Sequence, residues 1–216
     1  MLFRSITIEY QDRDAAPRHN QKQALLALHQ QVAAFFHQTL LKDPAAQPAR
    51  NYLSRRGLDS ATARAWQLGY APDAWDGLLK WAATKKFPVP LLETAGLVVP
   101  REGGGHYDRF RGRLMFPIAD DQGQVIAFSG RLLRDDQQQA KYVNSPETPI
   151  FHKGRVLFAL DKAKRALLDE KLAIICEGQV DTIACHRAGL ANVVAPQGTA
   201  LTEQQARTLK IGRAHV

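Results

Sequence analysis

Two carboxylates in this sequence have the spacing that a cation site requires. Glu177 directly follows residues 172–176, an apolar run that predicts a strand, and Asp181 lies four residues later in a predicted helix. A carboxylate at the carboxyl end of a parallel strand lies where α/β sheets place their active sites. Together the two side chains could share a hard divalent cation such as Mg²⁺, which prefers oxygen ligands.

Asp181 also has a purely structural interpretation. A negative side chain in the first turn of a helix is favoured by the partial positive charge of the helix N-terminus. The pattern strand, glutamate, glycine, helix is only moderately specific, so both interpretations stay open at this point.

A run of arginines, Arg109, Arg111 and Arg113, forms the second candidate site. In a strand alternate side chains share a face, so the three guanidiniums would form a ladder at intervals of roughly 6.6 Å. Such a ladder could follow the phosphate backbone of an extended nucleic-acid strand. The alternative is a solvated strand face that pairs with neighbouring aspartates. These are Asp108, Asp120 and Asp121.

Further polar side chains follow this run. Arg131 ends the next predicted strand, and Lys141 and Lys153 lie beyond it. Asn144 begins residues 144–147, whose amide and hydroxyl groups could donate to phosphate or ribose. Taken alone, the same four residues more often form a plain turn.

The elements that must position these side chains fall into three groups. The first is a helical layer, because apolar residues recur at helical spacing and glycines follow the helix ends. Its predicted helices cover residues 21–41, 49–56, 59–69, 76–86 and 88–94. The second is an antiparallel meander, in which strand-like runs alternate with turn signals. Its predicted strands cover residues 97–99, 107–118 and 125–133.

The third group follows a helix predicted over residues 156–170. Its predicted elements are, in order, a strand at 172–176, a helix at 180–186, a strand at 192–195 and a helix from 203. Thr202 and Gln205 form the predicted capping box of the last helix. Such an order predicts the opening of a parallel sheet. We therefore expect an α+β fold: a helical layer plus an antiparallel sheet subdomain, followed by the start of an α/β subdomain with a parallel sheet.

Composition narrows the class of protein. The chain has 216 residues, a mass of 24.0 kDa, a net charge of +8 and a sequence pI near 9.7, which favours a polyanionic partner. No run approaches 18 apolar residues, so we expect no membrane-spanning helix, and the first thirty residues lack a secretion signal. Cys176 and Cys185 fit a reducing cytoplasm, and we expect buried thiols without a disulfide framework or a zinc site.

Both ends of the chain resemble the translation of a sequencing adapter, at residues 2–5 and 211–216. We therefore expect the natural segment to run from about Ile6 to Lys210. On this interpretation residues 1–19 are the remnant of a linker, and 211–216 are an adapter-derived tail.

Seven strings, taken in order, resemble the bacterial replicative primase of the DnaG type. They lie at residues 52–58, 69–72, 107–118, 129–131, 141–148, 151–155 and 177–181. Each string alone is weak, but the seven span nearly the whole expected natural segment. The resemblance implies a DNA-dependent RNA polymerase that makes short RNA primers on single-stranded DNA during replication, using NTPs and Mg²⁺ or Mn²⁺.

The resemblance also implies an organisation. Residues 20–168 would be the N-terminal subdomain of the polymerase core, and 171–210 an incomplete Toprim subdomain. The complete protein would add a zinc-binding domain upstream, which is the only place for Zn²⁺. It would act in the cytoplasm, at the nucleoid, with a replicative helicase and single-strand-binding protein as partners and without contacting a membrane.

Roles for individual residues follow from the resemblance. Glu177 would act at the metal centre, as a ligand or a proton-transfer group, and Asp181 would support it as a second catalytic residue. A set of polar and basic residues would line the groove for template, primer or nucleotide. The set is Arg56, Arg109, Arg111, Arg131, Lys141, Asn144 and Lys153.

The sequence departs from the family pattern in three places, of which the first is that the amino-terminal zinc-binding domain is not part of it. The second acidic motif, Asp-x-Asp, is expected beyond residue 210, so this fragment alone should be inactive. Gln179 and Val180 replace the usual aromatic residue and methionine. Because only two strands of the Toprim sheet are expected, residues 171–216 should be poorly stable in isolation. The remaining alternatives are another Toprim enzyme, such as a topoisomerase or nuclease, and a non-catalytic nucleic-acid-binding module.

Overall fold

The computed structural model describes residues 15–134, 139–198 and 200–211. The adapter-like segments lie outside the described residues, apart from Ile211 at the end of the last helix. The helices are α1 (Ala15–Lys42), α2 (Gln47–Arg55), α3 (Ser60–Ala65), α4 (Gly77–Thr84), α5 (Val89–Thr94), α6 (Leu160–Glu170), α7 (Gln179–Arg187) and α8 (Glu203–Ile211). The strands are β1 (Gly69–Ala71), β2 (Val98–Pro100), β3 (His106–Asp108), β4 (Arg113–Ala119), β5 (Val125–Leu132), β6 (Tyr142–Asn144), β7 (Leu157–Phe158), β8 (Ile174–Ile175) and β9 (Val193–Pro196).

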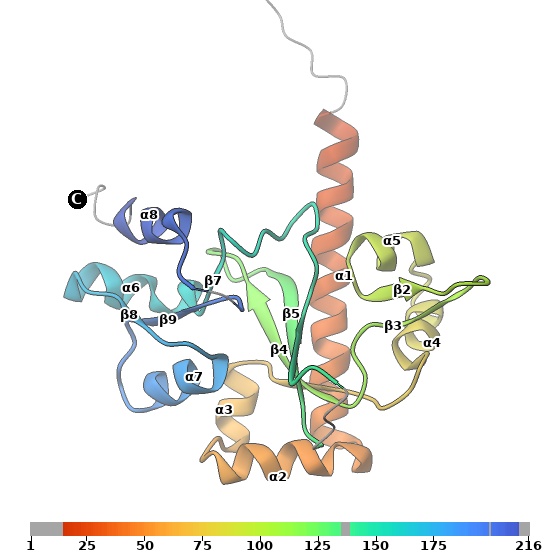
Figure 1. Cartoon of the computed structure of the whole chain (residues 1–216), viewed down its shortest axis with the longest axis horizontal. Helices are drawn as coiled ribbons and strands as arrows, with labels where there is room; N and C mark the ends of the chain where they lie inside the picture. Colours follow the sequence, from red (N-terminus) through yellow and green to blue (C-terminus); the bar gives the residue numbers. More distant parts are fainter. Residues whose placement is uncertain (1–14, 135–138, 199, 212–216) are drawn as a thin grey trace, which may run out of the picture.

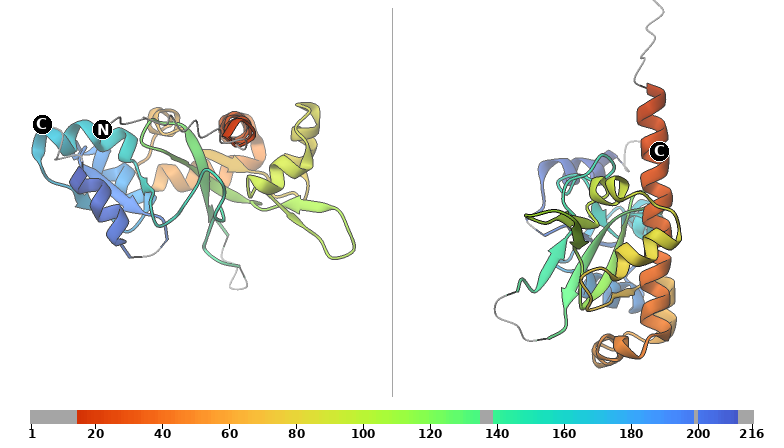
Figure 2. Two further views of the ribbon diagram at one scale, coloured as in Figure 1. Left: turned by 90° about the horizontal axis from the view of Figure 1, so that it is seen from above. Right: turned by 90° about the vertical axis from the view of Figure 1, so that its right-hand side faces the viewer.

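Helix α1 is the main element of the helical layer and runs along one face of the central sheet (Figures 1 and 2). Its buried side chains recur three or four residues apart, at Leu25, Leu28, Val32, Phe36 and Leu40, as the sequence predicts. Phe36 meets Phe128 of β5 edge to face, with 5.5 Å between ring centroids. In the described ranges no helix is both long and apolar enough to cross a membrane.

The central sheet is antiparallel, with strand order β1-β4-β5-β6. Strands β4 and β5 pair over most of their length, with Met115 opposite Gly130 and Phe116 opposite Ser129. Both strands are largely buried, because α1 packs against β1 and β5, and side chains of other helices and of the C-terminal sheet share their two core clusters. The predicted mixture of helices and antiparallel sheet is therefore confirmed.

The single strand predicted over residues 107–118 is wrong. Strand β3 ends at Asp108 and pairs with β2 in a separate two-stranded sheet, whereas β4 begins only at Arg113. Gly112, which lies between them, has a φ of +60°, a conformation that glycine adopts without strain and that a continuous strand does not contain. The alternation of side chains is therefore interrupted in the middle of the arginine run.

The C-terminal sheet has the order β7-β9-β8. Strands β8 and β9 are parallel, as predicted, but β7 pairs antiparallel with β9, so the expected two-stranded sheet is wrong. The helix predicted from residue 156 begins only at Leu160, because Leu157 and Phe158 are used in this pairing. Figure 2 shows this sheet and the β2–β3 hairpin on opposite sides of the central sheet.

Local capping follows the sequence closely in this region. The amide of Thr202 donates to Oε1 of Gln205 at 3.0 Å, and the amide of Gln205 donates to Oγ1 of Thr202 at 3.1 Å. The predicted capping box of α8 is thereby confirmed. The plain turn suggested for residues 144–147 is not present, since Asn144 is the last residue of β6 and the tight turn lies between Thr148 and Phe151.

Candidate nucleic-acid and metal site

Arg131 lies at the centre of an aromatic and cationic cluster. Its guanidinium lies 4.6 Å from the ring centroid of Tyr52 in α2 and 5.2 Å from that of Tyr142 in β6. It donates to the hydroxyl of Tyr142 at 2.6 Å, while the exposed Arg56 lies 5.6 Å from the ring of Tyr52. Two of the predicted basic residues are thus brought together by tyrosines that sequence reasoning did not assign.

Strand β6 positions two further predicted residues beside this cluster. The carbonyl of Lys141 accepts from the amide of Leu132 at 2.8 Å, and its side chain is exposed. Asn144 pairs with Ser129 of β5, and its Oδ1 is buried without a hydrogen-bond partner. A buried amide oxygen in this condition is available to a ligand or a water molecule.

Asn144 also connects the central sheet to the C-terminal one. Gly198 follows β9, and a Cβ added to it would lie 2.9 Å from Nδ2 of Asn144. With a φ of +91°, Gly198 both permits the turn and leaves room for this approach. The loop after β9 therefore lies directly against the end of β6.

The loop containing Glu177 begins where β8 ends. The amide of Cys176 donates to the carbonyl of Val194 at 2.9 Å, which extends the parallel pairing to the residue before Glu177. Glu177 and Asp181 are both exposed, and Oδ2 of Asp181 lies 3.3 Å from the position a Cβ would take on Gly178. The strand, glutamate, glycine, helix order is therefore realised, with Asp181 turned back over the start of α7.

Two buried amides join the ends of β8 and β9. Gln179, the first residue of α7, donates through Nε2 to Oε1 of Gln197 at 3.4 Å. Gln197 is 2% exposed, and its own Nε2 has no partner. The replacement of an aromatic residue by Gln179 is thus accommodated by a polar contact across the two strand ends.

The two carboxylates are of the type that binds Mg²⁺, but they are too few to complete a metal site. Glu177 and Asp181 offer the hard oxygen donors that the cation prefers. Among the described residues, however, no group of three or more His, Cys, Asp or Glu side chains could hold a metal ion. The described part of the chain therefore does not complete a metal site, and we derive no catalytic step through one.

The predicted arginine ladder is wrong. Arg113 is only 4% exposed, and its Nη1 donates to the carbonyls of Ala140 at 3.0 Å and Gly130 at 3.2 Å. Arg109 is half-buried and donates through Nε to the carbonyl of Gly96 at 2.8 Å. Burial lowers the pKa of both guanidiniums. Because the backbone leaves the strand at Gly112, the side chains point to different partners.

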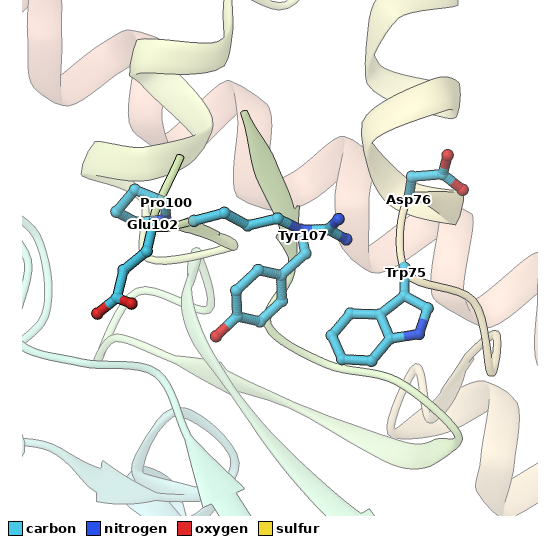
Figure 3. Close-up of a pocket in the computed structure, with 6 residues that line it drawn as sticks. Trp75, Asp76, Pro100, Glu102 and Tyr107 are labelled. Atoms are coloured by element: carbon cyan, nitrogen blue, oxygen red, sulfur yellow. The ribbon is translucent and has the colours of Figure 1, made fainter. Parts of the chain in front are cut away.

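Arg111 lies instead on an exposed aromatic surface. Its guanidinium lies 4.1 Å from the ring centroid of Trp75 and 5.1 Å from that of Tyr107, and Arg101 lies 5.4 and 5.6 Å from the same rings. Figure 3 shows Trp75 and Tyr107 facing an open pocket between α4 and the β2–β3 hairpin. Trp75 is 58% exposed. We call these four residues the Trp75 platform.

Sequence reasoning missed the Trp75 platform. The available signal was a tryptophan immediately before a helix start, outside the apolar periodicity of that helix. Nothing in the spacing of Trp75 and Tyr107 predicts that their rings lie 5.5 Å apart, because α4 and α5 intervene in the sequence.

Asp108 holds the Trp75 platform to α4. Its carboxylate, 3% exposed, accepts from the amides of Leu78 at 2.6 Å and Leu79 at 3.1 Å, and its carbonyl accepts from Arg111. Burial raises the pKa of Asp108 to about 6, and the hydrogen bonds from the two amides oppose that rise. Asp108 is thus a structural residue, and it does not pair with a solvated arginine face.

Lys153 is fixed through its backbone. Its amide donates to Oε1 of Glu147 at 2.9 Å, and its carbonyl accepts from Nε2 of Gln205 at 3.0 Å. The first of these bonds lowers the pKa of Glu147. Lys153 therefore lies where the loop after β6 meets the start of α8, and the contacts that fix it do not involve its ammonium group.

The two cysteines differ from expectation. Both are partly exposed, and their sulfur atoms lie 3.9 Å apart. Burial, followed by the neighbouring Cys185 thiol, raises the pKa of Cys176. The prediction of two buried thiols is wrong, since strand β8, which ends just before Cys176, is the outer strand of its sheet.

Comparisons with known proteins decide the family. A model described as the DNA primase catalytic core, N-terminal domain, matches residues 35–164, more than half of the chain. The chain belongs to the DnaG-type family of bacterial DNA primases. A Toprim domain model matches residues 171–216. The match that precedes the Toprim segment favours a primase over the topoisomerase or nuclease alternative.

Curated primases are similar over most of this chain but are much longer. The DNA primase of Synechocystis sp. is 43% identical over 218 residues, which cover 96% of this chain and 34% of the relative. That of Pseudomonas aeruginosa is 42% identical over 198 residues, covering 91% and 30%. The chain thus spans about a third of the length of these curated relatives.

Solved primase structures share the fold. The RNA polymerase domain of Mycobacterium tuberculosis primase DnaG, in complex with double-stranded DNA, is 40% identical with a TM-score of 0.84 and covers 89% of this chain and 60% of that one. A DnaG primase catalytic domain bound to single-stranded DNA is 38% identical with a TM-score of 0.81, covering 90% and 62%. The helical layer, antiparallel sheet and Toprim start are therefore those of a primase core.

Proposed function

We propose that this chain is part of a primase polymerase core, a nucleotidyltransferase that joins NTPs into short RNA primers on single-stranded DNA. The observation that carries the proposal is the contact between Asn144 and Gly198. It supports the proposal because Asn144, on the strand proposed to bind nucleotide, lies against the loop after β9, and β9 is the neighbour of β8, the strand that leads to Glu177. Primer synthesis needs this proximity, because nucleotide phosphates must lie between basic side chains and a metal held by carboxylates.

The basic residues divide into two groups. Arg56, Arg131 and Lys141 lie near Asn144 and are assigned to phosphates of nucleotide, primer or template. Lys153, near the start of α8, is assigned to the same region. Their charges supply the sequence-independent part of nucleic-acid affinity.

The second group lies at the β2–β3 hairpin and is assigned to template. The Trp75 platform combines the exposed ring of Trp75 and the partly buried ring of Tyr107 with the guanidinium of Arg111, the combination on which single-stranded bases stack. Arg109 lies between Tyr107 and Arg111 of this platform in sequence. Its remaining guanidinium N–H groups are assigned to the template backbone. Two DNA-bound relatives, one with single-stranded DNA, support this assignment.

Glu177 is assigned to the metal centre, with Asp181 supporting it. Toprim domains generally bind Mg²⁺, and Mn²⁺ is the proposed substitute. When bound, such a cation neutralises phosphate charge during transfer. Because the described residues provide two carboxylates, the remaining ligands must come from elsewhere in a complete primase, and this fragment alone is proposed to be inactive.

For the complete protein we propose the partners of a replication enzyme. These are template DNA, the RNA primer, a replicative helicase and single-strand-binding protein, at the nucleoid in the cytoplasm. Zinc belongs to a separate upstream domain.

The binding surface is tested by reversing two charges. Arg111→Glu combined with Lys141→Glu should weaken binding of a single-stranded oligonucleotide and flatten its salt dependence, by about 0.7 in log–log slope for each phosphate that the variant no longer neutralises. Fluorescence anisotropy between about 50 and 200 mM salt measures both quantities. Arg165→Glu on α6, at a side chain 88% exposed, is the matched control. Unchanged affinity and slope in the double variant would overturn the surface assignment.

A further inference from the structure

The cysteine pair lies beside the most important residue of the proposed site. Cys176 immediately precedes Glu177, and Cys185 lies in the last turn of α7. Their sulfur atoms are 3.9 Å apart, although the two residues are nine positions apart in sequence. Both side chains are partly exposed, so a small oxidant can reach them.

We propose that Cys176 and Cys185 are a site of reversible oxidative modification, at which a peroxide forms an intramolecular disulfide. The sulfurs must approach from 3.9 Å to about 2.05 Å, a change on the scale of side-chain rotation. The first thiol reduces the peroxide and becomes a sulfenic acid, releasing one water. The sulfur of the second thiol then attacks the sulfenic sulfur, the S–S bond forms, and the hydroxyl leaves with the thiol proton as a second water.

Two features make this pairing specific. The chain has two cysteines, so an intramolecular disulfide can form in one way only. The backbone on both sides is also held, since the amide of Cys176 donates to Val194 and the carbonyl of Cys185 accepts from Leu190 at 3.0 Å. The thiols are therefore kept facing each other by β8 and α7.

The disulfide would join the end of β8 to α7 across the loop containing Glu177. Asp181 lies on the same helix, so both carboxylates lie within the segment that the bond would close. The consequence for Glu177 rests on the proposed function. The disulfide would hold the Glu177 loop in one conformation, and the reduced form would leave that loop free to adjust.

The test treats the whole chain with hydrogen peroxide and measures its mass under non-reducing conditions. The expected product is a monomer lighter by about 2 Da, whose digest contains one peptide pair joined through Cys176 and Cys185 and separable by a thiol reductant. Cys176→Ser and Cys185→Ser should each abolish the mass loss. Circular dichroism of both variants confirms that they remain folded.

Two results would overturn the proposal. A gain of about 16 or 32 Da on the peptides that contain Cys176 or Cys185, without loss of two hydrogens, would show that the thiols oxidise independently. A disulfide-linked dimer would show that they meet other chains more readily than each other.

A second measurement distinguishes this proposal from the proposed function. Oxidation should slow amide exchange in residues 174–187 by on the order of tenfold, because the closed segment opens less often. The affinity for single-stranded DNA should not change, since the basic surface lies on other elements. A chain that forms the disulfide but binds no DNA would contradict the proposed function and leave the modification site standing; DNA binding without the disulfide would do the reverse.

Discussion

At the scale of single residues, burial decides what each charged group can do. Arg113 and Asp108 belong to the same charged run as Arg111, yet they are 4% and 3% exposed and hold backbone groups, while Arg111 lies on the surface of Trp75 and Tyr107. A buried charge must be satisfied by hydrogen bonds, whereas an exposed one keeps its capacity for a ligand. Of this run, Arg111 is therefore the residue whose guanidinium the fold leaves available to a ligand.

Asp108 predicts a measurable pH dependence of stability. Its pKa of about 6 in the folded state exceeds the ordinary value of 3.8, so between those values the folded protein binds the proton more readily than the unfolded chain. The contribution is therefore present at low pH and is lost as pH rises through about 6, by about 3 kcal/mol in the free energy of unfolding. Urea unfolding at several pH values measures it.

Asp108→Asn provides the reference for this measurement. It keeps an acceptor for the amide of Leu78 but cannot titrate. The comparison is needed because His29 also contributes to the pH dependence of stability. Burial lowers the pKa of His29 to about 4, so the unfolding free energy decreases as pH falls from 6.5 towards 4. This effect has the opposite sign to that of Asp108. If the variant and the parent lose stability equally between pH 4 and 7, the Asp108 assignment is wrong.

Trp75 predicts a loss of affinity without a loss of stability. Trp75→Ala should weaken single-stranded DNA binding by roughly tenfold or more, because stacking on one aromatic side chain contributes about 1–3 kcal/mol per base. Its side chain is 58% exposed, so the unfolding free energy should change little. The control is Leu190→Ala, at an exposed side chain of the Toprim part. Trp66→Ala would be unsuitable, because the Trp66 ring is stacked on Phe158 and its loss would change packing. Equal affinities for the parent, Trp75→Ala and Leu190→Ala would contradict the stacking role.

At the scale of elements, the site depends on close approach between segments far apart in sequence. Strand β6 and the loop after β9 meet because Gly198 has no side chain where Asn144 lies. Arg131 is likewise held between α2 and β6. Each element forms for local reasons, but the proposed site exists only where the elements touch.

Gly198→Ala tests this approach. The new Cβ would lie 2.9 Å from Nδ2 of Asn144, so the loop must move away from β6. We expect a loss of about 1–3 kcal/mol in unfolding free energy and weaker nucleotide binding. Gly103→Ala is the matched control, with a φ of +89° and nothing within 4 Å of its Cβ. If both variants bind nucleotide alike, the approach of the loop has no functional role.

At the scale of the whole molecule, stability is unevenly distributed. The central sheet is buried between α1 and the other elements, whereas β8 has a partner on one side only among the described strands. Large apolar side chains remain exposed in the C-terminal part. They are Leu168, Leu172, Ile175, Leu190 and Leu201. The Toprim start is thus anchored through β7 and β9 and open at β8.

Hydrogen exchange should reveal this gradient. Amides of β8 and α7 should exchange faster than those of β4 and β5, because local opening near an edge strand exposes little additional apolar surface. Amides of β9 should be intermediate, since it pairs on both sides. Mass spectrometry of peptides from the intact chain measures all three regions. Equal protection of β8 and β4 would contradict the gradient.

Features fixed by local physical chemistry could be predicted from the sequence. Apolar periodicity predicted α1, and the residues Thr202 and Gln205 predicted the capping box of α8. The order of elements predicted a parallel pairing of β8 with β9, and so placed Glu177 at a strand end. Each of these depends on residues close together in the chain.

Tertiary structure alone decided how these parts combine. The arginine run was broken because Gly112 leaves the strand, and residues 157 and 158 became a strand because β9 was available to pair with them. The Trp75 platform and the facing sulfurs of Cys176 and Cys185 arise from packing between elements. Local pattern specifies which face of an element is apolar, but the partner of that face is set by the free energy of burying it against the rest of the chain.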